Sequence, residues 1–182
     1  MSDSDASRGE IVFSTPFFDV VAKPMPRGGH PHYSLRKADY VTVLALTPQG
    51  RIPLVRQYRP AVDAFTLELP SGLLEPGEEP IETANRELQE ESGWNARRIE
   101  PLAVLRPDVG RLGNRLWVFF ADGLEPCSRP GDPDEEIERV ELAPEELVET
   151  IRSGEFVHAP HLAVLMLGVL HGRLPAALLA PR

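Results

Sequence analysis

One helix in this sequence has clearly marked ends, and its position constrains the fold more than any other feature. Pro80 suits the first helical position, because its fixed φ matches a helix and its missing N–H needs no partner there. Gly93 can adopt the left-handed conformation that commonly ends a helix. Between them, Ile81, Ala84 and Leu88 recur at helical spacing and predict an apolar stripe. The sequence therefore predicts one helix from Pro80 up to Gly93, with that stripe on the core.

Three glutamates lie on an adjoining face of this predicted helix. Glu87, Glu90 and Glu91 are spaced i, i+3 and i+4, so their carboxylates converge over one turn. Like charges at this spacing repel one another, and Mg²⁺ or Mn²⁺, which bind oxygen ligands, would relieve the repulsion. A run of glutamates on a helix is more often an ordinary solvated face. The glutamates alone therefore do not establish a metal site.

Strands outnumber helices in the rest of the sequence, which predicts an α+β domain. Apolar and β-branched segments predict strands at 11–21, 40–46, 52–58, 65–69, 102–105, 116–120 and 137–142. The tight turn at 47–50 predicts that the strands on either side of it pair as a hairpin. Two later helices are predicted, from Pro144 to about Ile151 and from His161 to Leu170. We interpret His158 and His161 as residues of a helix start, because no partnered set of metal ligands is evident.

Composition and charge restrict the compartment and the partners. The chain has 182 residues and a net charge of -9, which disfavours nucleic acids and anionic membranes as partners. Cys127 is the only cysteine, so no intrachain disulfide can form and a reducing compartment is the default. The first ten residues lack the apolar core of a signal peptide, and the longest apolar stretch, 162–170, is too short to span a bilayer. We expect a single-domain cytoplasmic protein.

The segment Gly72–Trp94 carries a more specific pattern than its glutamates alone. It reads GLLEPGEEPIETANRELQEESGW, with glycine, glutamate, Arg-Glu, an apolar residue, Glu-Glu, glycine and a hydrophobe at fixed intervals. In every fixed position it resembles the signature of the Nudix hydrolases, and chance is a poor explanation for so many matches. The resemblance implies an α/β/α sandwich with a mixed central β-sheet. This segment, the box, would form a loop, a helix and a loop.

The resemblance also implies roles for individual residues of the box. The implied metal ligands are the carboxylates of Glu87, Glu90 and Glu91 and the carbonyl of Ser71. Arg86 and Glu78 would form an ion pair that holds the helix against the loop. Nudix proteins hydrolyse nucleoside diphosphates linked to a further moiety, and bound metal ions neutralise the diphosphate and lower the pKa of a water molecule. The expected metal is Mg²⁺, with Mn²⁺ as the alternative.

Residues before the box resemble one particular branch of the Nudix hydrolases. The sequences VRQYR, ending at Arg59, and LELPSG, ending at Gly72, are similar to the lead-in of the ADP-ribose and ADP-sugar pyrophosphatase branch. This similarity implies that Arg59 contacts substrate through phosphate, which suits the fixed fork of a guanidinium. Arg56 and Glu68 are further candidates for substrate contact. The alternative is that Arg56 and Arg59 are only solvent-exposed charges at the end of a strand.

Two features after the box bear on substrate and chemistry. Pro107 matches a proline that this branch carries in a loop, although here the proline lies slightly closer to the box. The branch takes its general base from a later acidic loop, for which Glu136 is the first candidate and Glu135 the second. The alternative is that this acidic segment is an ordinary solvated loop with no catalytic role. If neither glutamate is the base, Glu87 or a metal-bound hydroxide could serve, and Glu91 is expected to be essential in either case.

The expected domain organisation and function follow from the same resemblance. Residues 1–39 resemble an arm of N-terminal strands that this branch exchanges between subunits, which predicts a homodimer, and residues 40–182 would form the Nudix domain. The expected reaction is hydrolysis of the small molecule ADP-ribose to AMP and ribose 5-phosphate. GDP-mannose, NADH and dinucleoside polyphosphates remain alternative substrates. A non-catalytic nucleotide sensor is the other alternative, although a pure binder would not need three clustered carboxylates.

Overall fold

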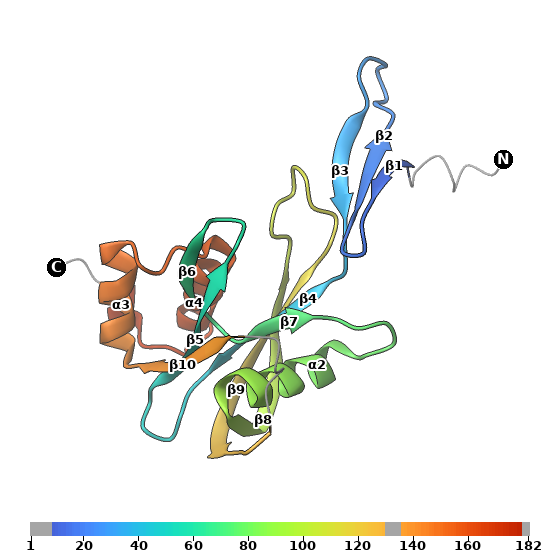
Figure 1. Ribbon diagram of the computed structural model, residues 1–182. Coiled ribbons are helices and arrows are strands. Elements are labelled where there is room, and N and C mark those ends of the chain that lie inside the picture. The colour runs from blue at the N-terminus through green and yellow to red at the C-terminus, as the bar shows by residue number, and fades with distance from the viewer. Residues whose placement is uncertain (1–8, 130–135, 180–182) are drawn as a thin grey trace.

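The computed structural model describes residues 9–129 and 136–179, which form an α+β architecture as predicted (Figure 1). The strands are β1 (Glu10–Ser14), β2 (Asp19–Lys23), β3 (His32–Arg36), β4 (Tyr40–Ala45), β5 (Ile52–Arg59), β6 (Ala64–Glu68), β7 (Ser71–Leu73), β8 (Trp94–Leu105), β9 (Leu116–Pro126) and β10 (Ile137–Leu142). The helices are α2 (Pro80–Glu87), α3 (Pro144–Ser153) and α4 (Ala159–Leu170), with the π-helical turn η1 (Leu88–Ser92) and the 3-10 turn η2 (Ala176–Leu179). No helix in this described part is long and apolar enough to cross a membrane.

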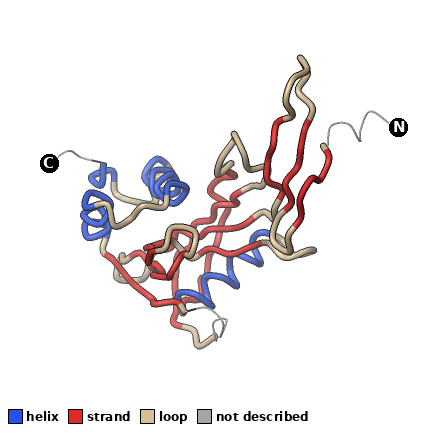
Figure 2. The backbone as a smooth tube through the Cα atoms, turned by 45° about the horizontal axis from the view of Figure 1, so that its top comes forward, coloured by secondary structure: helices blue, strands red, loops and turns tan. Residues whose placement is uncertain are grey.

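The central sheet has the strand order β7-β4-β9-β8 and lies between two helical layers (Figure 2). Strands β4 and β9 run parallel and the other pairs antiparallel, which confirms the predicted mixed sheet. Successive residues of a strand point to opposite faces. On β4, Val41 and Val43 therefore pack with Ala84 of α2, whereas Leu44 packs with Leu165 of α4. This two-sided burial explains the nearly continuous apolar sequence of β4.

A second sheet, with the order β10-β5-β6, contradicts the predicted hairpin of β4 and β5. The tight turn is present, because the Thr47 N–H donates to the Arg51 carbonyl at 2.9 Å. After it, however, β5 pairs with β6 and β10. Strand β9 pairs with β4 along its whole length, and β7 pairs with its other edge at Tyr40, Val41 and Thr42, so β4 has a partner on each side that is not β5. The turn therefore leads from one sheet into the other.

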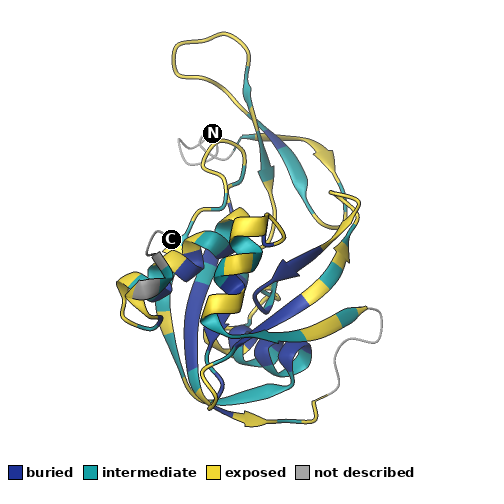
Figure 3. Ribbon diagram, turned by 90° about the vertical axis from the view of Figure 1, so that its left-hand side faces the viewer, coloured by how far each residue is buried: buried dark blue, intermediate teal, exposed yellow. Residues whose placement is uncertain are grey.

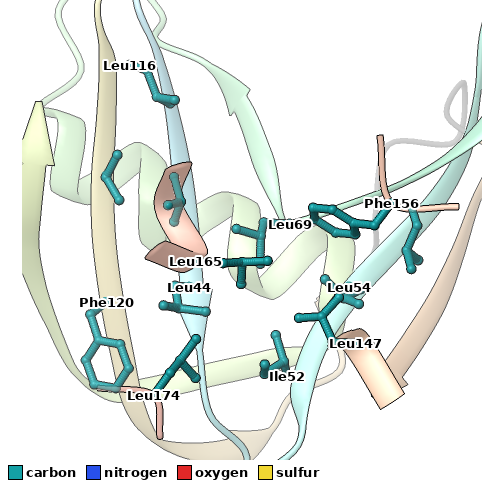
Figure 4. Close-up of a cluster of buried hydrophobic side chains, with 13 residues drawn as sticks. Leu44, Ile52, Leu54, Leu69, Leu116, Phe120, Leu147, Phe156, Leu165 and Leu174 are labelled. Atoms are coloured by element: carbon teal, nitrogen blue, oxygen red, sulfur yellow. The ribbon is translucent and has the colours of Figure 1, made fainter. Parts of the chain in front are cut away.

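The main hydrophobic core joins the two sheets to α3 and α4 (Figure 4). Leu44 and Leu69 come from the sheet side, while Leu147, Phe156 and Leu165 come from the helical side. Leu69 lies in the short connection between β6 and β7, so this core reaches the chain immediately before the box. The core thus holds the entry to the box against α4.

The first three strands form a separate antiparallel sheet, β1-β2-β3, which projects from the rest of the molecule (Figures 1 and 3). It carries exposed large hydrophobic side chains, among them Ile11, Phe13 and Phe17. The sheet is attached through β3, where the Leu35 N–H donates to the Arg111 carbonyl at 2.8 Å. The sequence predicted one or two strands here but not β3, because polar and apolar residues are mixed in the range 32–36.

The helical segment of the box and strands β8 and β9 also differ from the prediction. The helix that begins at Pro80 does not continue as one α-helix to Gly93, because it changes to a π-helical turn at Leu88. Ile81, predicted to belong to the apolar stripe, is 41% exposed, so the buried stripe consists of Ala84 and Leu88. Strands β8 and β9 extend well beyond the predicted ranges 102–105 and 116–120, because they pair with each other along almost their whole length.

Candidate metal and substrate site

The box occupies β7, α2, η1 and the loop between β7 and α2. Gly93 has a φ of 75° and ends the helical segment, as predicted. Of the three clustered glutamates that are the expected metal ligands, Glu87 and Glu91 are buried, and Glu90 is half-buried. Glu90 and Glu91 lie in the π-helical turn, which changes their angular positions relative to Glu87 from those of a regular α-helix. Turns of this kind occur frequently at functional sites.

Strand β7 lies against this helical face so closely that one residue can have no side chain. A Cβ atom at Gly72 would overlap the carboxylate of Glu87, and even its more distant oxygen, Oε2, would be only 2.6 Å away. The absence of a side chain at Gly72 is therefore a steric requirement of the Glu87 carboxylate.

Ser71 connects β7 to a second box glutamate. The Ser71 N–H donates to Glu91 Oε2 at 2.7 Å, so this backbone segment and this carboxylate are held together. The structure thus brings Ser71, Glu87 and Glu91 to one place, between β7 and the helical segment. The proposed donors are all oxygen atoms of carboxylates or a carbonyl, which is the chemistry that Mg²⁺ and Mn²⁺ prefer.

Arg86 compensates the negative charge of this region. Its guanidinium lies 3.3 Å from Glu78, 2.8 Å from Glu87 and 3.1 Å from Glu90. Burial alone would lower the pKa of Arg86, but these carboxylates raise it above its ordinary value. The hydrogen bond from Arg86 in turn lowers the pKa of Glu78. The predicted Arg86–Glu78 pair is present, and Arg129 adds a further cation 3.0 Å from Glu90.

A residue that sequence reasoning missed stabilises the end of the helical segment. Arg139, on β10, donates to the carbonyl of Glu90 at 3.0 Å and to that of Glu91 at 3.2 Å. A cation is favourable at a helix C-terminus, where carbonyl groups lack partners within the helix. Arg139 is far from the box in sequence, so no local pattern could have indicated this contact.

Three of the predicted substrate-binding residues line one cavity. Arg56, Arg59 and Glu68 face a space of about 640 Å³ between the β5–β6 hairpin and the residues that connect α3 to α4. Glu68 is buried, and Arg59 donates to it through Nε at 2.7 Å and Nη2 at 2.8 Å. Burial raises the pKa of Glu68, but Arg59 and Thr66 outweigh this effect and lower it to about 2. Glu68 therefore fixes the Arg59 guanidinium at the cavity wall.

His158 and His161 lie next to Glu68, with their rings stacked at 3.7 Å. The predicted helix-start role of His158 is confirmed, because its ring accepts from the His161 N–H at 3.4 Å. The expectation that no ligand partner lies nearby is wrong, because ligand atoms of Glu68, His158 and His161 lie within 4.8 Å of one another.

Proximity alone does not make these three residues a metal site. Nδ1 of His161 accepts from the Leu69 N–H at 3.1 Å, which leaves the proton of the neutral ring on Nε2. Nε2 then donates to Ser71 Oγ at 3.2 Å. Both ring nitrogens of His161 are thereby engaged, and Glu68 is already bound by Arg59 and Thr66. We therefore interpret the three residues as a structural cluster rather than a metal site.

The buried ring of His161 predicts that acid destabilises the fold. Burial, and next the charge of His158, lower the pKa of His161 from 6.5 to about 3. Between these values the unfolded chain binds a proton that the folded chain does not, so the free energy of unfolding falls as the pH falls. For this one group the slope reaches about 1.4 kcal/mol per pH unit. Urea unfolding between pH 6.5 and 4.5 should show this decrease.

His161→Asn is the comparison for this measurement, and its slope in the same pH window should be shallower. The window avoids the contribution of Glu68, whose stabilising charge is lost only as the pH falls from 4.5 toward about 2. Equal slopes for the two proteins would show that His161 is protonated in the folded state.

The remaining predicted residues lie elsewhere. Pro107 is half-buried in the loop between β8 and β9, the loop that contacts β3, and it does not line the cavity of Arg59. Glu136 is exposed and immediately precedes β10, which pairs with β5, the strand of Arg56. Glu135 lies outside the described residues.

Comparisons with known proteins agree with this architecture. Residues 36–164 match the NUDIX domain family. An ADP-ribose pyrophosphatase of Bacillus subtilis (strain 168) is 36% identical over 121 residues, 65% of each chain, so this chain spans just under two thirds of that relative. The CMP-5'-(N-acetyl-N-hydroxy-3-aminopropyl)phosphonate hydrolase of Streptomyces rubellomurinus (strain ATCC 31215) is 31% identical over 88% of this chain and 82% of its own length.

A solved structure gives the same result for the fold. The crystal structure of an ADP compounds hydrolase superposes with a TM-score of 0.75 at 25% identity, and covers 90% of this chain and 92% of that one. Together with the sequence relatives, it confirms the predicted resemblance to the ADP-ribose and ADP-sugar pyrophosphatase branch.

Proposed function

The chain belongs to the Nudix family, whose enzymes generally use divalent metals, and we propose that it is a Mg²⁺-dependent pyrophosphohydrolase. The proposed reaction cuts the diphosphate of ADP-ribose to give AMP and ribose 5-phosphate. The observation that carries this proposal is the meeting of Ser71, Glu87 and Glu91 between β7 and the helical segment. Such a concentration of oxygen donors suits a hard divalent cation.

In this proposal the metal is held by the carboxylates of Glu87, Glu90 and Glu91 and by the carbonyl of Ser71. When bound, Mg²⁺ supplies neutralisation of the diphosphate charge and a lowered pKa for a bound water molecule. Arg86 and Arg139 keep the glutamates in place, through their ion pairs and through the carbonyls of η1. Glu136 is the proposed general base that takes the proton from the attacking water, with Glu135 as the second choice.

The cavity of Arg56, Arg59 and Glu68 is the proposed binding site for part of the substrate. Arg59 presents a permanently charged group whose direction is fixed by Glu68, and a fixed guanidinium binds phosphate well. Glu68 would thus act through Arg59, because its carboxylate is buried. Pro107 remains a proposed contact from the loop beside β3.

Arg59→Lys is expected to raise the KM for the substrate about 10-fold, with a smaller change in kcat. Lysine keeps the charge but cannot donate to Glu68 through two fixed nitrogens while facing the cavity. Steady-state kinetics at saturating Mg²⁺ measure both constants. Arg97→Lys, which alters an exposed pair with Glu125 on the β8–β9 hairpin, is the control. An unchanged KM for Arg59→Lys would show that the Arg59 guanidinium does not bind the substrate.

The test of the proposed function is a substrate panel with Mg²⁺. ADP-ribose, ADP-glucose, GDP-mannose, NADH, a diadenosine polyphosphate and a CMP-linked phosphonate are incubated with the protein, and phosphatase releases phosphate from the products. Cleavage of ADP-ribose in preference to the others supports the full proposal. Preferential cleavage of another compound would change the proposed substrate but would still support the proposed pyrophosphohydrolase reaction. If a nucleotide binds without metal and nothing is cut, the chain is a nucleotide sensor and the proposal fails.

We also propose that the chain is a cytoplasmic homodimer that associates through the β1–β3 arm. The support is the exposed apolar surface of that arm, where Phe17 is 79% exposed, since large exposed apolar patches commonly mark contact surfaces. Light scattering should give twice the mass of the chain, and Phe13→Asp should lower it to that of one chain. A wild-type protein of single-chain mass would contradict the proposal.

A further inference from the structure

The bend that leads into the box has an unusual arrangement of hydrogen-bond donors. Pro70 stands at its centre and has no N–H, so the backbone donors of the bend belong to Leu69 and Ser71. The Ser71 N–H donates to Glu91, a proposed metal ligand. The Leu69 N–H donates instead to Nδ1 of His161, which comes from the first turn of α4. Each N–H of the bend is therefore held by a side chain from a different helical element.

His161 makes a second contact with the same bend. Its Nε2 lies 3.2 Å from Ser71 Oγ, and Ser71 Oγ also lies 2.8 Å from Thr42 Oγ1 and 2.8 Å from the Leu69 carbonyl. His161 is fully buried, and its ring is packed against His158. One rigid ring thus spans the bend from Leu69 to Ser71, and its two bonds need the single neutral tautomer deduced above.

We infer that His161 is a positioning residue for the proposed metal site: it fixes Ser71 and, through the Ser71 N–H, the carboxylate of Glu91. The inference rests on the proposed function, because Ser71 and Glu91 are ligands only in that proposal. Residues behind metal ligands that fix their orientation typically change metal affinity or activity by 10- to 100-fold when they are replaced. His161 would not contact the metal itself and would act through Ser71 and Glu91.

The test uses three replacements of His161 and measures Mn²⁺ affinity by electron paramagnetic resonance, kcat, KM and Tm. His161→Phe keeps a ring of similar shape but removes both hydrogen bonds. It should weaken Mn²⁺ binding by about 10-fold or more and lower kcat, with little change in KM. His161→Asn can still accept from the Leu69 N–H, and His161→Gln can still donate to Ser71 Oγ. Each of these two variants should therefore bind Mn²⁺ more tightly than His161→Phe but less tightly than the wild type.

Two further variants separate positioning from general stability. Thr47→Val removes another buried hydrogen bond, to the Arg51 N–H in the β4–β5 turn, and should lower Tm without changing Mn²⁺ affinity. Ser71→Ala removes the hydroxyl that His161 contacts but retains the backbone carbonyl and the N–H. It should weaken Mn²⁺ binding, and adding it to His161→Asn, which has already lost the contact with Ser71 Oγ, should cost less than the sum of the two. Ser71→Ala also provides the test if His161→Phe does not fold.

Several outcomes would overturn the inference. Mn²⁺ affinity and kcat that stay at wild-type values in folded His161→Phe and Ser71→Ala would show that His161 is only a structural residue. Stoichiometric Zn²⁺ bound by the wild type but lost in both His161→Phe and Glu68→Gln would show that the cluster is a metal site instead. A wild-type protein that binds no Mn²⁺ and cuts no substrate would overturn the proposed function as well, so the two failures are distinguishable.

Discussion

Glu91→Gln is expected to lower kcat by at least about 100-fold, since even the residues behind metal ligands contribute 10- to 100-fold. Glutamine keeps the shape of the side chain, and its amide oxygen can still accept from the Ser71 N–H. It removes the negative charge, which the proposed metal site requires from this buried position. The measurement is turnover of the preferred substrate at saturating Mg²⁺, together with Mn²⁺ affinity.

Glu82→Gln is the matched control for this variant. Glu82 is exposed in the first turn of α2, so the same chemical change is made in the same helical segment but at an exposed position. Glu82→Gln should keep wild-type turnover. A kcat for Glu91→Gln within threefold of the wild type would show that Glu91 is not a metal ligand.

Gly72→Ala is expected to cost about 10- to 100-fold in Mn²⁺ affinity and kcat, with a smaller effect on stability. The added Cβ would occupy the space of the Glu87 carboxylate. Gly72 does not have a positive φ, so alanine itself fits the backbone. The atoms that must move belong to the end of a flexible side chain, and the strain is therefore relieved by displacing Glu87. Parallel measurements of kcat, Mn²⁺ affinity and Tm separate the two effects.

Gly113→Ala provides the comparison for Gly72→Ala. Its backbone is not left-handed either, and the nearest atom to an added Cβ is the Leu35 carbonyl oxygen at 3.9 Å, an ordinary contact. This variant should keep the activity and metal affinity of the wild type. If Gly72→Ala behaves in the same way, the Glu87 carboxylate does not need its present position, and its proposed role as a ligand is wrong.

The sequence predicted best what nearby residues determine. Pro80 and Gly93 mark the ends of the helical segment correctly, and the Arg86–Glu78 pair forms because both residues lie within the box. Strand β10 and the start of α3 at Pro144 also agree with the prediction. The π-helical turn was missed because a regular period of 3.6 residues was assumed. Ile81 was wrongly assigned to the core, because it lies in the first turn of α2 and is exposed.

The features that could not be predicted from the sequence depend on contacts between segments that are far apart in the chain. The turn at 47–50 is a local feature, but the separation of β4 and β5 into two sheets depends on which strands occupy the edges of β4. Arg139 contacts the box from β10, and His161 contacts the bend before the box from α4. Neither residue has a sequence pattern of its own that indicates a partner. His161 was interpreted only as part of a helix start, since its contacts to Leu69 and Ser71 appear only in the folded chain.

The distant origin of these contacts determines when the site can be completed during synthesis. Strand β4 needs its parallel partner β9, the box helix needs Arg139, and the bend before the box needs His161. Translation proceeds from the N-terminus, so a ribosome that has released the whole box still holds the residues that fix its geometry. The nascent chain therefore acquires its glutamates early and a complete site only after α4 has emerged.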